Sequence, residues 1–407
     1  MTLANNNGLR ADQSAPRRAD WLTTAQLIFS ALFTLFYGGV SVVMFAFSLP
    51  EVRSATASNP TPLFGYSMGI ICAILALFNL ASAYYAGKAL RLGVDSIRTE
   101  KRMRWLNALI ALLPFNLIVG ALVFPNQTLR NYLLPVLTSL SLTIGVIWLI
   151  RVGSKNLWGN HPQRDSGLIS LMSGFTVWFI MFLEMMVMLM MGVMLFAGVM
   201  TNPDLFNRFE QLLPLFQQAN PDTESLMRAL EGMVSLPLLI GGAMFLIAGI
   251  LPVIEELFKT IGVWMLSGRK LTPQEGWTAG LMSGAGFALV EGLFYGLQMT
   301  MAPDATTWIS TLIGRTGGTI LHTLFGGMVG LAYARSWRDG KAGRVLGVYV
   351  AVIAMHGLWN ALAIAQGALA LGGKSAMATN WMYLPLGLMM VIMLIAYLAK
   401  SRKLERP

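Results

Sequence analysis

The chain has 407 residues, of which 55% are hydrophobic and only 12% charged, and its mean hydropathy is +0.61. Its apolar residues occur in repeated blocks of about 18 or more, which excludes an ordinary soluble domain and predicts several membrane crossings. The net charge of +10 does not indicate nucleic-acid binding, because no basic patch with interleaved aromatic residues is present.

About ten apolar blocks are long enough to cross a bilayer as helices. Helices are favoured over a β-barrel because the apolar runs are continuous rather than alternating. The sequence therefore predicts an all-α, polytopic integral membrane helical bundle. The expected spans are 22–49, 63–86, 105–123, 133–150, 168–200, 235–267, 276–301, 308–334, 345–370 and 382–399.

The charges of the connecting segments predict the orientation. With the N-terminus in the cytoplasm, 22 of the 29 lysines and arginines fall in cytoplasmic segments. This bias follows the positive-inside rule, so we expect both termini in the cytoplasm and basic loops facing an anionic leaflet. The first span lacks an obvious cleavage site and is expected to be retained, in a bacterial plasma membrane.

The composition divides the chain into five parts. Residues 1–20 are polar and are expected to form a disordered cytoplasmic tail, and residues 21–165 hold four spans that we interpret as a membrane scaffold. Residues 166–234 contain the fifth span and an outside loop with two expected amphipathic helices, more simply a packed cap than a substrate-recognition element. Residues 235–370 hold spans six to nine, and residues 371–407 the tenth span and a basic cytoplasmic tail.

The fifth span contains a methionine-rich run around Glu184. The methionines are most simply adaptable packing. Glu184 is either a functional carboxylate or a protonated one bonded to a neighbouring helix. The only cysteine, Cys72, leaves no disulfide or cysteine-based metal site within one chain.

Ionisable residues are concentrated in spans six to nine. Measured from the cytoplasmic end of each span, five of them lie between 11 and 14 residues deep, a common layer roughly 16 to 21 Å from the inner boundary. Ionisable residues with no shared role should lie at different depths in the membrane, whereas the residues of one reaction centre must lie at a common depth. The five residues are Glu255, Glu256, Glu291, His322 and His356.

Spacing adds further expectations. Lys259 is expected to act as counter-ion for one carboxylate of the Glu255–Glu256 pair, which would leave the other free to act as a base. Glycines in two spans form small-xxx-small faces that allow close helix packing. They are Gly276, Gly280 and Gly284, Gly292 and Gly296, and Gly326 and Gly330.

Four motifs on successive spans carry a family resemblance: EELFK (255–259), FALVE (287–291), RTGGTILH (315–322) and HGLWN (356–360). Their order and spacing resemble the PrsW family of intramembrane proteases, which is related to the CAAX prenyl protease and bacteriocin-processing superfamily. Glu291 stands where those relatives carry histidine, and the basic residue lies closer to the glutamate pair, which argues against prenyl-protein processing. The resemblance covers residues 236–370 and makes them the expected protease core.

The resemblance implies an endopeptidase that cuts a membrane-tethered protein, in the family's best-known role an anti-sigma factor. Glu255 would activate a water, with Glu256 and His322 positioning it, while His356 and Asn360 would stabilise the oxyanion or leaving group. The resemblance implies five catalytic residues and three supporting ones. The catalytic residues are Glu255, Glu256, Glu291, His322 and His356, and the supporting residues are Lys259, Arg315 and Asn360.

Two versions of this chemistry remain open. Zn²⁺ or another divalent metal could be held by Glu256, Glu291, His322 and His356, although no His-Glu-xx-His motif is present. A glutamic protease would need no metal. His161, beside Pro162 in a cytoplasmic loop, is interpreted as a bystander.

Two other functions compete with proteolysis. Midplane acids and histidines, with Pro252 placed to break the sixth span, are also typical of a proton-coupled secondary transporter, although no inverted repeat is evident. A non-catalytic membrane scaffold of the same fold is the second alternative. The expected partners are a membrane-tethered protein substrate and the lipid bilayer; substrate identity and oligomeric state are not encoded in any motif.

Overall fold

The computed structural model describes residues 21–56, 59–93, 110–155, 161–204, 206–207, 210, 214, 236–371, 381 and 383–405. Within these residues the chain is helical apart from turns and one isolated bridge between Thr56 and Asn59. This confirms the all-α polytopic bundle. The expected disordered tail (1–20) and most of the outside loop with its amphipathic helices lie outside the described residues.

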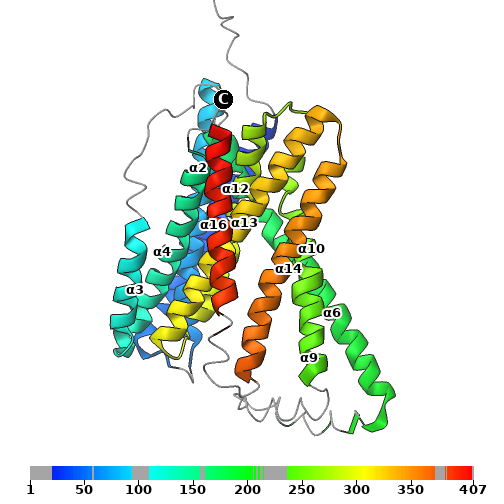
Figure 1. The fold of residues 1–407 in the computed structure, drawn as a ribbon. Coiled ribbons are helices and arrows are strands. Elements are labelled where there is room, and N and C mark those ends of the chain that lie inside the picture. The colour runs from blue at the N-terminus through cyan, green and yellow to red at the C-terminus, as the bar shows by residue number, and fades with distance from the viewer. Residues whose placement is uncertain are drawn as a thin grey trace, which may run out of the picture.

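The first four expected spans correspond to four helices of the N-terminal half (Figure 1). α1 and α2 run side by side as an antiparallel pair, and α3 packs against α4. α3 has 12 residues and begins at Leu112, after a 3-10 turn at 110–111, and residues 101–109 lie outside the described part. The bounds are α1 Trp21–Ser48, α2 Thr61–Leu92, α3 Leu112–Val123 and α4 Gln127–Gly153.

The remaining six spans also correspond to helices, two of which contain π-helical segments. The fifth consists of α5 (Pro162–Leu171), η4 (Met172–Thr176, π) and α6 (Val177–Thr201). The sixth consists of α9 (Leu236–Ala243), η5 (Met244–Ile250, π), α10 (Leu251–Phe258) and α11 (Ile261–Trp264). The last four are α12 (Pro273–Met299), α13 (Ala305–Asp339), α14 (Gly343–Leu371) and α16 (Tyr383–Glu405).

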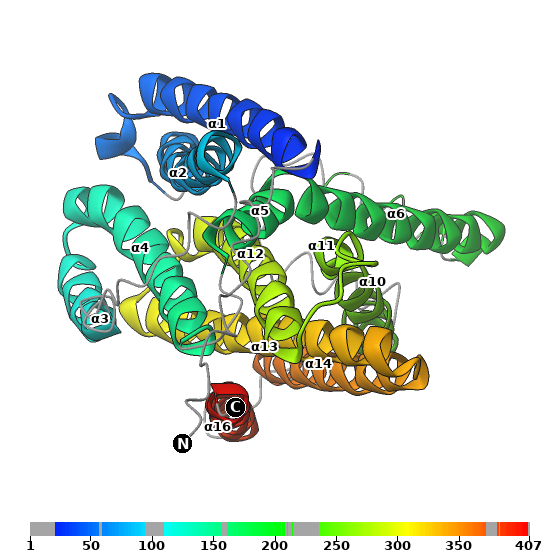
Figure 2. The same cartoon turned by 90° about the horizontal axis from the view of Figure 1, so that it is seen from above.

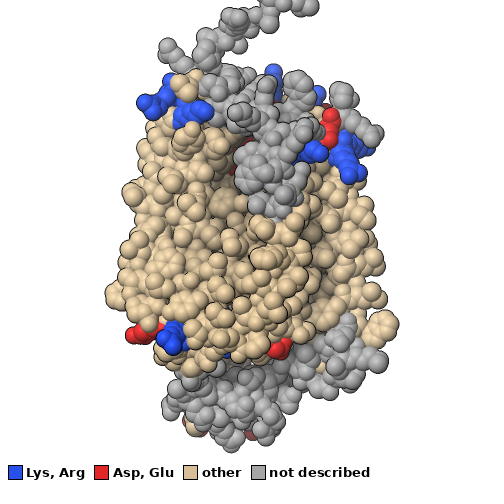
Figure 3. Space-filling view, turned by 90° about the vertical axis from the view of Figure 1, so that its left-hand side faces the viewer, with Lys and Arg blue, Asp and Glu red and all other residues tan. Residues whose placement is uncertain are grey.

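Eight helices in the described part of the chain are long and apolar enough to cross a membrane. The two expected spans outside this set are α3, which is short, and α13, which carries Arg315 and His322 within its length. A broad belt without basic or acidic residues separates two charged ends on the face shown in Figure 3. Most of the visible lysines and arginines gather at the end where the C-terminus lies, which is consistent with the predicted orientation.

α12 lies at the centre of the bundle, and most of its residues are buried (Figure 2). Its partner α13 approaches it closely because both helices present glycines. A Cβ at Gly280 would collide with the carbonyl oxygen of Gly326, and one at Gly330 with that of Gly276. The predicted small-xxx-small packing is therefore observed between α12 and α13.

The other two glycines of α12 face a different neighbour. The nearest atoms to a Cβ at Gly292 or Gly296 belong to α4, and they lie at ordinary contact distances of 3.4 to 3.8 Å. Gly292 and Gly296 therefore leave room for a Cβ, whereas the glycines that face α13 do not.

Polar side chains join α1 and α2 to the fifth span. Ser30 lies at 2.8 Å from both Ser82 and Ser170, and Ser170 donates to Asn79 at 2.6 Å. The Tyr37 hydroxyl donates to the Ser173 carbonyl of η4 at 2.5 Å. Between lipid-facing helices such hydrogen bonds fix rotation about the helix axis, so the N-terminal half is docked on the part of the chain that carries Glu184.

Candidate active site

The sixth span is interrupted where it delivers the two glutamates. In η5 the backbone follows the π register, in which the N–H of Leu251 donates to the carbonyl of Leu246. Pro252 follows at the start of α10, and the helix ends at Phe258, directly before Lys259. Glu255 and Glu256 therefore lie in the last turn of α10 and are both buried.

Glu256 is fully buried and has two partners on different elements. Its Oε1 atom forms an ion pair with Lys259, which is also fully buried, and lies 2.8 Å from Nδ1 of His356, in position to accept a hydrogen bond from it. Lys259 also lies 3.3 Å from Nδ1 of His322. Glu256 is thus held by a cation and an imidazole, as a buried carboxylate requires.

Glu291 forms the second carboxylate–histidine pair. Its Oε2 atom lies 2.9 Å from Nε2 of His322 and 2.7 Å from Nη2 of Arg315. The guanidinium of Arg315 in turn lies over the ring of Tyr295, 4.1 Å from its centroid. Arg315 therefore neutralises Glu291, while Glu291 fixes the orientation of the His322 ring.

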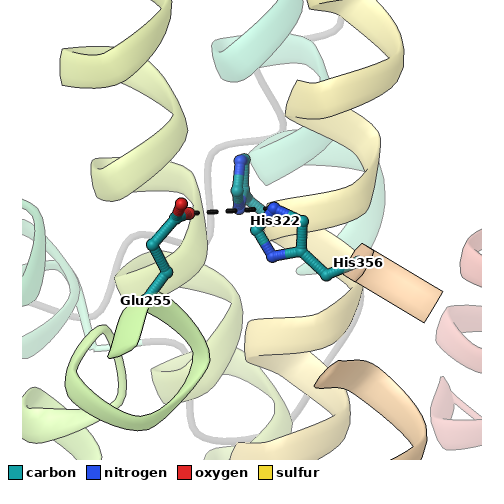
Figure 4. A group of neighbouring side chains, drawn as sticks. All are labelled: Glu255, His322 and His356. Atoms are coloured by element: carbon teal, nitrogen blue, oxygen red, sulfur yellow. Dashed lines mark ion pairs between the residues drawn. The ribbon is translucent and has the colours of Figure 1, made fainter. Parts of the chain in front are cut away.

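Glu255 differs from the other two carboxylates because no cation is paired with it in the described part of the chain. Its Oε2 atom is buried, accepts no hydrogen bond from the described residues, and lies 3.8 Å from Nε2 of His356. Figure 4 shows the Glu255 carboxylate directed toward the two imidazoles. A buried polar atom without a partner indicates that water, an ion or a substrate belongs there.

Glu255, His322 and His356 are a group of residues that could hold a divalent metal ion, and Nδ1 of His322 also lies 3.3 Å from Nζ of Lys259, a cation that would compete with the ion. One ligand atom from each lies within 4.8 Å of those of the other two. Two imidazoles and one carboxylate are a zinc-type donor set, and each imidazole has a second carboxylate on its other side, Glu291 for His322 and Glu256 for His356.

The structure brings all five residues of the predicted layer into mutual reach. Their arrangement differs from the sequence-based metal set of Glu256, Glu291, His322 and His356, because Glu255 is the carboxylate whose oxygen lies with the imidazole nitrogens. Glu256 instead contacts Nδ1 of His356, and Glu291 contacts Nε2 of His322.

Two further sequence-predicted residues lie apart from this centre. Asn360 donates its side-chain N–H to the carbonyl of Ile247 at 2.9 Å and does not contact the glutamates. His161, interpreted as a bystander, lies 3.6 Å from Glu275 at the start of α12, away from the site.

Glu184 adds a carboxyl group from a fifth helix. It is the only ionisable residue of α6, and its side chain lies within hydrogen-bonding reach of that of Glu255. Phe179 of α6 packs against Phe258 of α10, with ring centroids 5.3 Å apart, which fixes this contact. The sequence marks Glu184 as a candidate but does not show which helix its side chain faces, because its neighbours on every side of α6 are apolar.

Tyr295 and Ser283 were not found by sequence reasoning. Tyr295 lies one turn beyond Glu291 on α12, a spacing that could have indicated its contact with Arg315. Ser283 donates to the carbonyl of Lys259 at 2.7 Å and so fixes the chain where α10 ends. No sequence signal distinguishes Ser283 from other buried serines.

Comparison with known proteins adds one finding. The sequence model described as the PrsW family intramembrane metalloprotease matches residues 223–398, which include every helix from α9 to α16 that contributes to the site. Neither the curated proteins nor the solved structures give a match. Over residues 223–398 the chain is therefore similar to the PrsW family of intramembrane metalloproteases, and its apolar helices make it a multi-pass membrane protein.

Proposed function

We propose that this protein hydrolyses peptide bonds of membrane-tethered proteins at the centre formed by Glu255, His322 and His356. The observation that carries the proposal is that the two adjacent glutamates have different ion-pair partners. Glu256 is neutralised by the Lys259 ammonium, whereas Glu255 pairs with no lysine or arginine among the described residues and its Oε2 atom lies 3.8 Å from Nε2 of His356. A carboxylate in that position is able to accept a proton.

In the metal-free version of the proposal, Glu255 is the general base. It removes a proton from a water as the water oxygen attacks the peptide carbonyl carbon, and the proton passes to the departing amide nitrogen when the C–N bond breaks. His356, oriented by Glu256, donates to the oxyanion or the leaving group, while His322, held between Glu291 and Lys259, positions the groups around the water. Their positions are fixed before the substrate arrives, so no reorganisation opposes the reaction.

In the metal-dependent version, Glu255, His322 and His356 hold a divalent ion such as zinc. When bound, such an ion polarises the substrate carbonyl and provides a hydroxide-like water near neutral pH. Glu256 and Glu291, which contact one nitrogen of His356 and of His322, would keep the two imidazoles oriented for such an ion. The two versions differ in the part played by Glu255, which is a ligand in one and the base in the other.

Metal analysis of the purified protein distinguishes these versions without an activity readout. The metal-dependent version expects about one equivalent of zinc or another divalent ion per chain, lost in both His322→Ala and Glu255→Gln. A wild-type protein that holds no divalent ion, or whose ion content is unchanged in His322→Ala and Glu255→Gln, would contradict it and leave the glutamic version.

The proposed substrate is a protein with a single transmembrane segment in a bacterial plasma membrane, similar to an anti-sigma factor. Support comes from the family match and from the burial of the site within helices long enough to cross a bilayer. Cleavage of such a protein would release its cytoplasmic part.

Reconstitution tests the proposal directly. The purified protein and a single-span substrate are placed in proteoliposomes containing H₂¹⁸O, and the products are analysed by mass spectrometry. We expect a cut in or next to the transmembrane segment, with one ¹⁸O in the new carboxyl group. An intact substrate, together with Glu291-dependent solute uptake by the same vesicles, would instead support the transporter.

A further inference from the structure

The carbonyl of Ile247 in η5 lacks the backbone donor that its helix register would provide. In the π register of this segment each N–H donates to the carbonyl five residues earlier, as Leu251 does to Leu246. The next donor in that series would be residue 252, and its acceptor would be Ile247. Position 252 is proline, which has no N–H.

Asn360 of α14 supplies the missing donor. Its Nδ2 atom lies 2.9 Å from the Ile247 oxygen. One turn away, the two backbones also touch, because a Cβ at Gly357 would collide with the carbonyl oxygen of Ala248. η5 and α14 are therefore joined by one side-chain hydrogen bond and one contact that only glycine allows.

This junction lies one helical turn from the catalytic contact on α14 and about two turns from it on the sixth span. His356 precedes Asn360 by four residues, and Glu255 and Glu256 follow Ile247 by eight and nine residues, with Pro252 between them. The contacts between these two turns are His356 Nδ1 to Glu256 Oε1 at 2.8 Å and His356 Nε2 to Glu255 Oε2 at 3.8 Å. The register of α10 against α14 therefore sets both distances.

We infer that Asn360 is a positioning residue that sets the register of the glutamate helix against the histidine helix by satisfying the carbonyl that Pro252 leaves free. This role replaces the direct oxyanion contact implied by the family resemblance. Pro252 and Asn360 act as a pair: the proline creates the free carbonyl, and the asparagine uses it to join the two helices. The inference rests on the proposed function only where activity is the readout.

A rescue experiment tests the pair. Asn360→Leu removes the donor at similar size and is expected to lower kcat by about tenfold to a hundredfold with little change in KM, because small misplacements of catalytic groups cost that much. In the Pro252→Ala background, the N–H of residue 252 provides a local donor. There we expect Asn360→Leu to lower kcat less than about threefold.

Matched controls make the result specific. The control variant is Pro135→Ala, at a proline inside α4, a helix that contributes no residue to the site; it is expected not to rescue Asn360→Leu. Equal losses of kcat from Asn360→Leu in the wild-type and Pro252→Ala backgrounds would overturn the inference, because a group that contacts the substrate cannot be replaced by a backbone N–H in another helix.

Thermal unfolding in detergent gives a readout that does not depend on protease activity. Asn360→Leu is expected to lower Tm in the wild-type background and to lower it less in Pro252→Ala, because the two residues share one acceptor. Additive shifts in Tm would overturn the hydrogen-bond pair. If the wild-type protein cleaves no substrate but the Tm shifts are non-additive, the proposed function fails and the pairing of Pro252 with Asn360 stands.

Discussion

Lys259 forms its ion pair with Glu256, three residues earlier, and not with Glu255, four residues earlier. Both residues of the pair are fully buried, so each charge depends on the other. Glu255 is consequently the carboxylate that remains free to face His356. The division of work between the adjacent glutamates follows from this one pairing.

Replacing the two glutamates should therefore affect stability very differently. Glu256→Gln leaves the buried Lys259 ammonium without a counter-ion and is expected to cost about 3–5 kcal/mol of unfolding free energy. Glu255→Gln breaks no ion pair with a cation and is expected to cost less than about 1 kcal/mol. Unfolding in detergent measures both.

The double variant Glu256→Gln/Lys259→Met provides the control for that prediction. Removing both charges should recover a large part of the lost stability, because no uncompensated charge stays buried. Equal destabilisation by Glu255→Gln and Glu256→Gln would show that Lys259 serves both carboxylates.

The close packing of α12 on α13 predicts a contrast between two glycines of α12. Gly280→Ala places a Cβ against the Gly326 carbonyl and is expected to cost about 1–3 kcal/mol through overpacking. Gly292→Ala meets only Leu142 at 3.8 Å and should be neutral or stabilising by up to about 1 kcal/mol, as usual for glycine to alanine within a helix. Unfolding curves that show no difference between the two variants would contradict the observed interface.

Glu184 is predicted to support Glu255 through its side-chain contact. Glu184→Gln keeps a group able to hydrogen-bond Glu255 and should retain kcat within about threefold. Glu184→Leu should lower kcat by about tenfold to a hundredfold, the usual range for losing a hydrogen bond to a charged group. Stability should hardly change, because Trp178 and Phe179 anchor α6 on α12 and α10.

Met188→Leu, one turn further along α6, is the matched control and should behave as wild type. A fully active Glu184→Leu would remove Glu184 from the site. If Glu184→Gln were as inactive as Glu184→Leu, the carboxyl group itself would be required, and a purely supporting contact would be wrong.

Much of this fold could be predicted from the sequence because the bilayer restricts the possible structures. Continuous apolar blocks predict helices, and the depth of an ionisable residue follows from counting along its helix. The meeting of Glu256 with His356 and of Glu291 with His322 was predictable in this sense. Spacing also predicted the close approach of α12 and α13 through glycines, although it did not separate Gly292 and Gly296, which face α4.

Rotation and register could not be predicted in the same way. Residues three and four apart lie on the same side of a helix, so spacing did not decide whether Lys259 pairs with Glu255 or Glu256. Asn360 depends on the π register of η5, which the sequence shows only as a proline in an apolar run. Glu184 lies in a helix that is apolar all round, so nothing indicated which way it faces.

The rate at which reconstituted protein cleaves a single-span substrate, compared between wild type and Glu255→Gln, tests the central claim most directly. The account predicts that Glu255→Gln folds normally but loses at least about a thousandfold in rate, because the substituted group either accepts the proton or holds the ion. Glu51→Gln, at an exposed position outside the site, should cleave as the wild type does. Cleavage by Glu255→Gln at the wild-type rate would contradict the assignment of the active site.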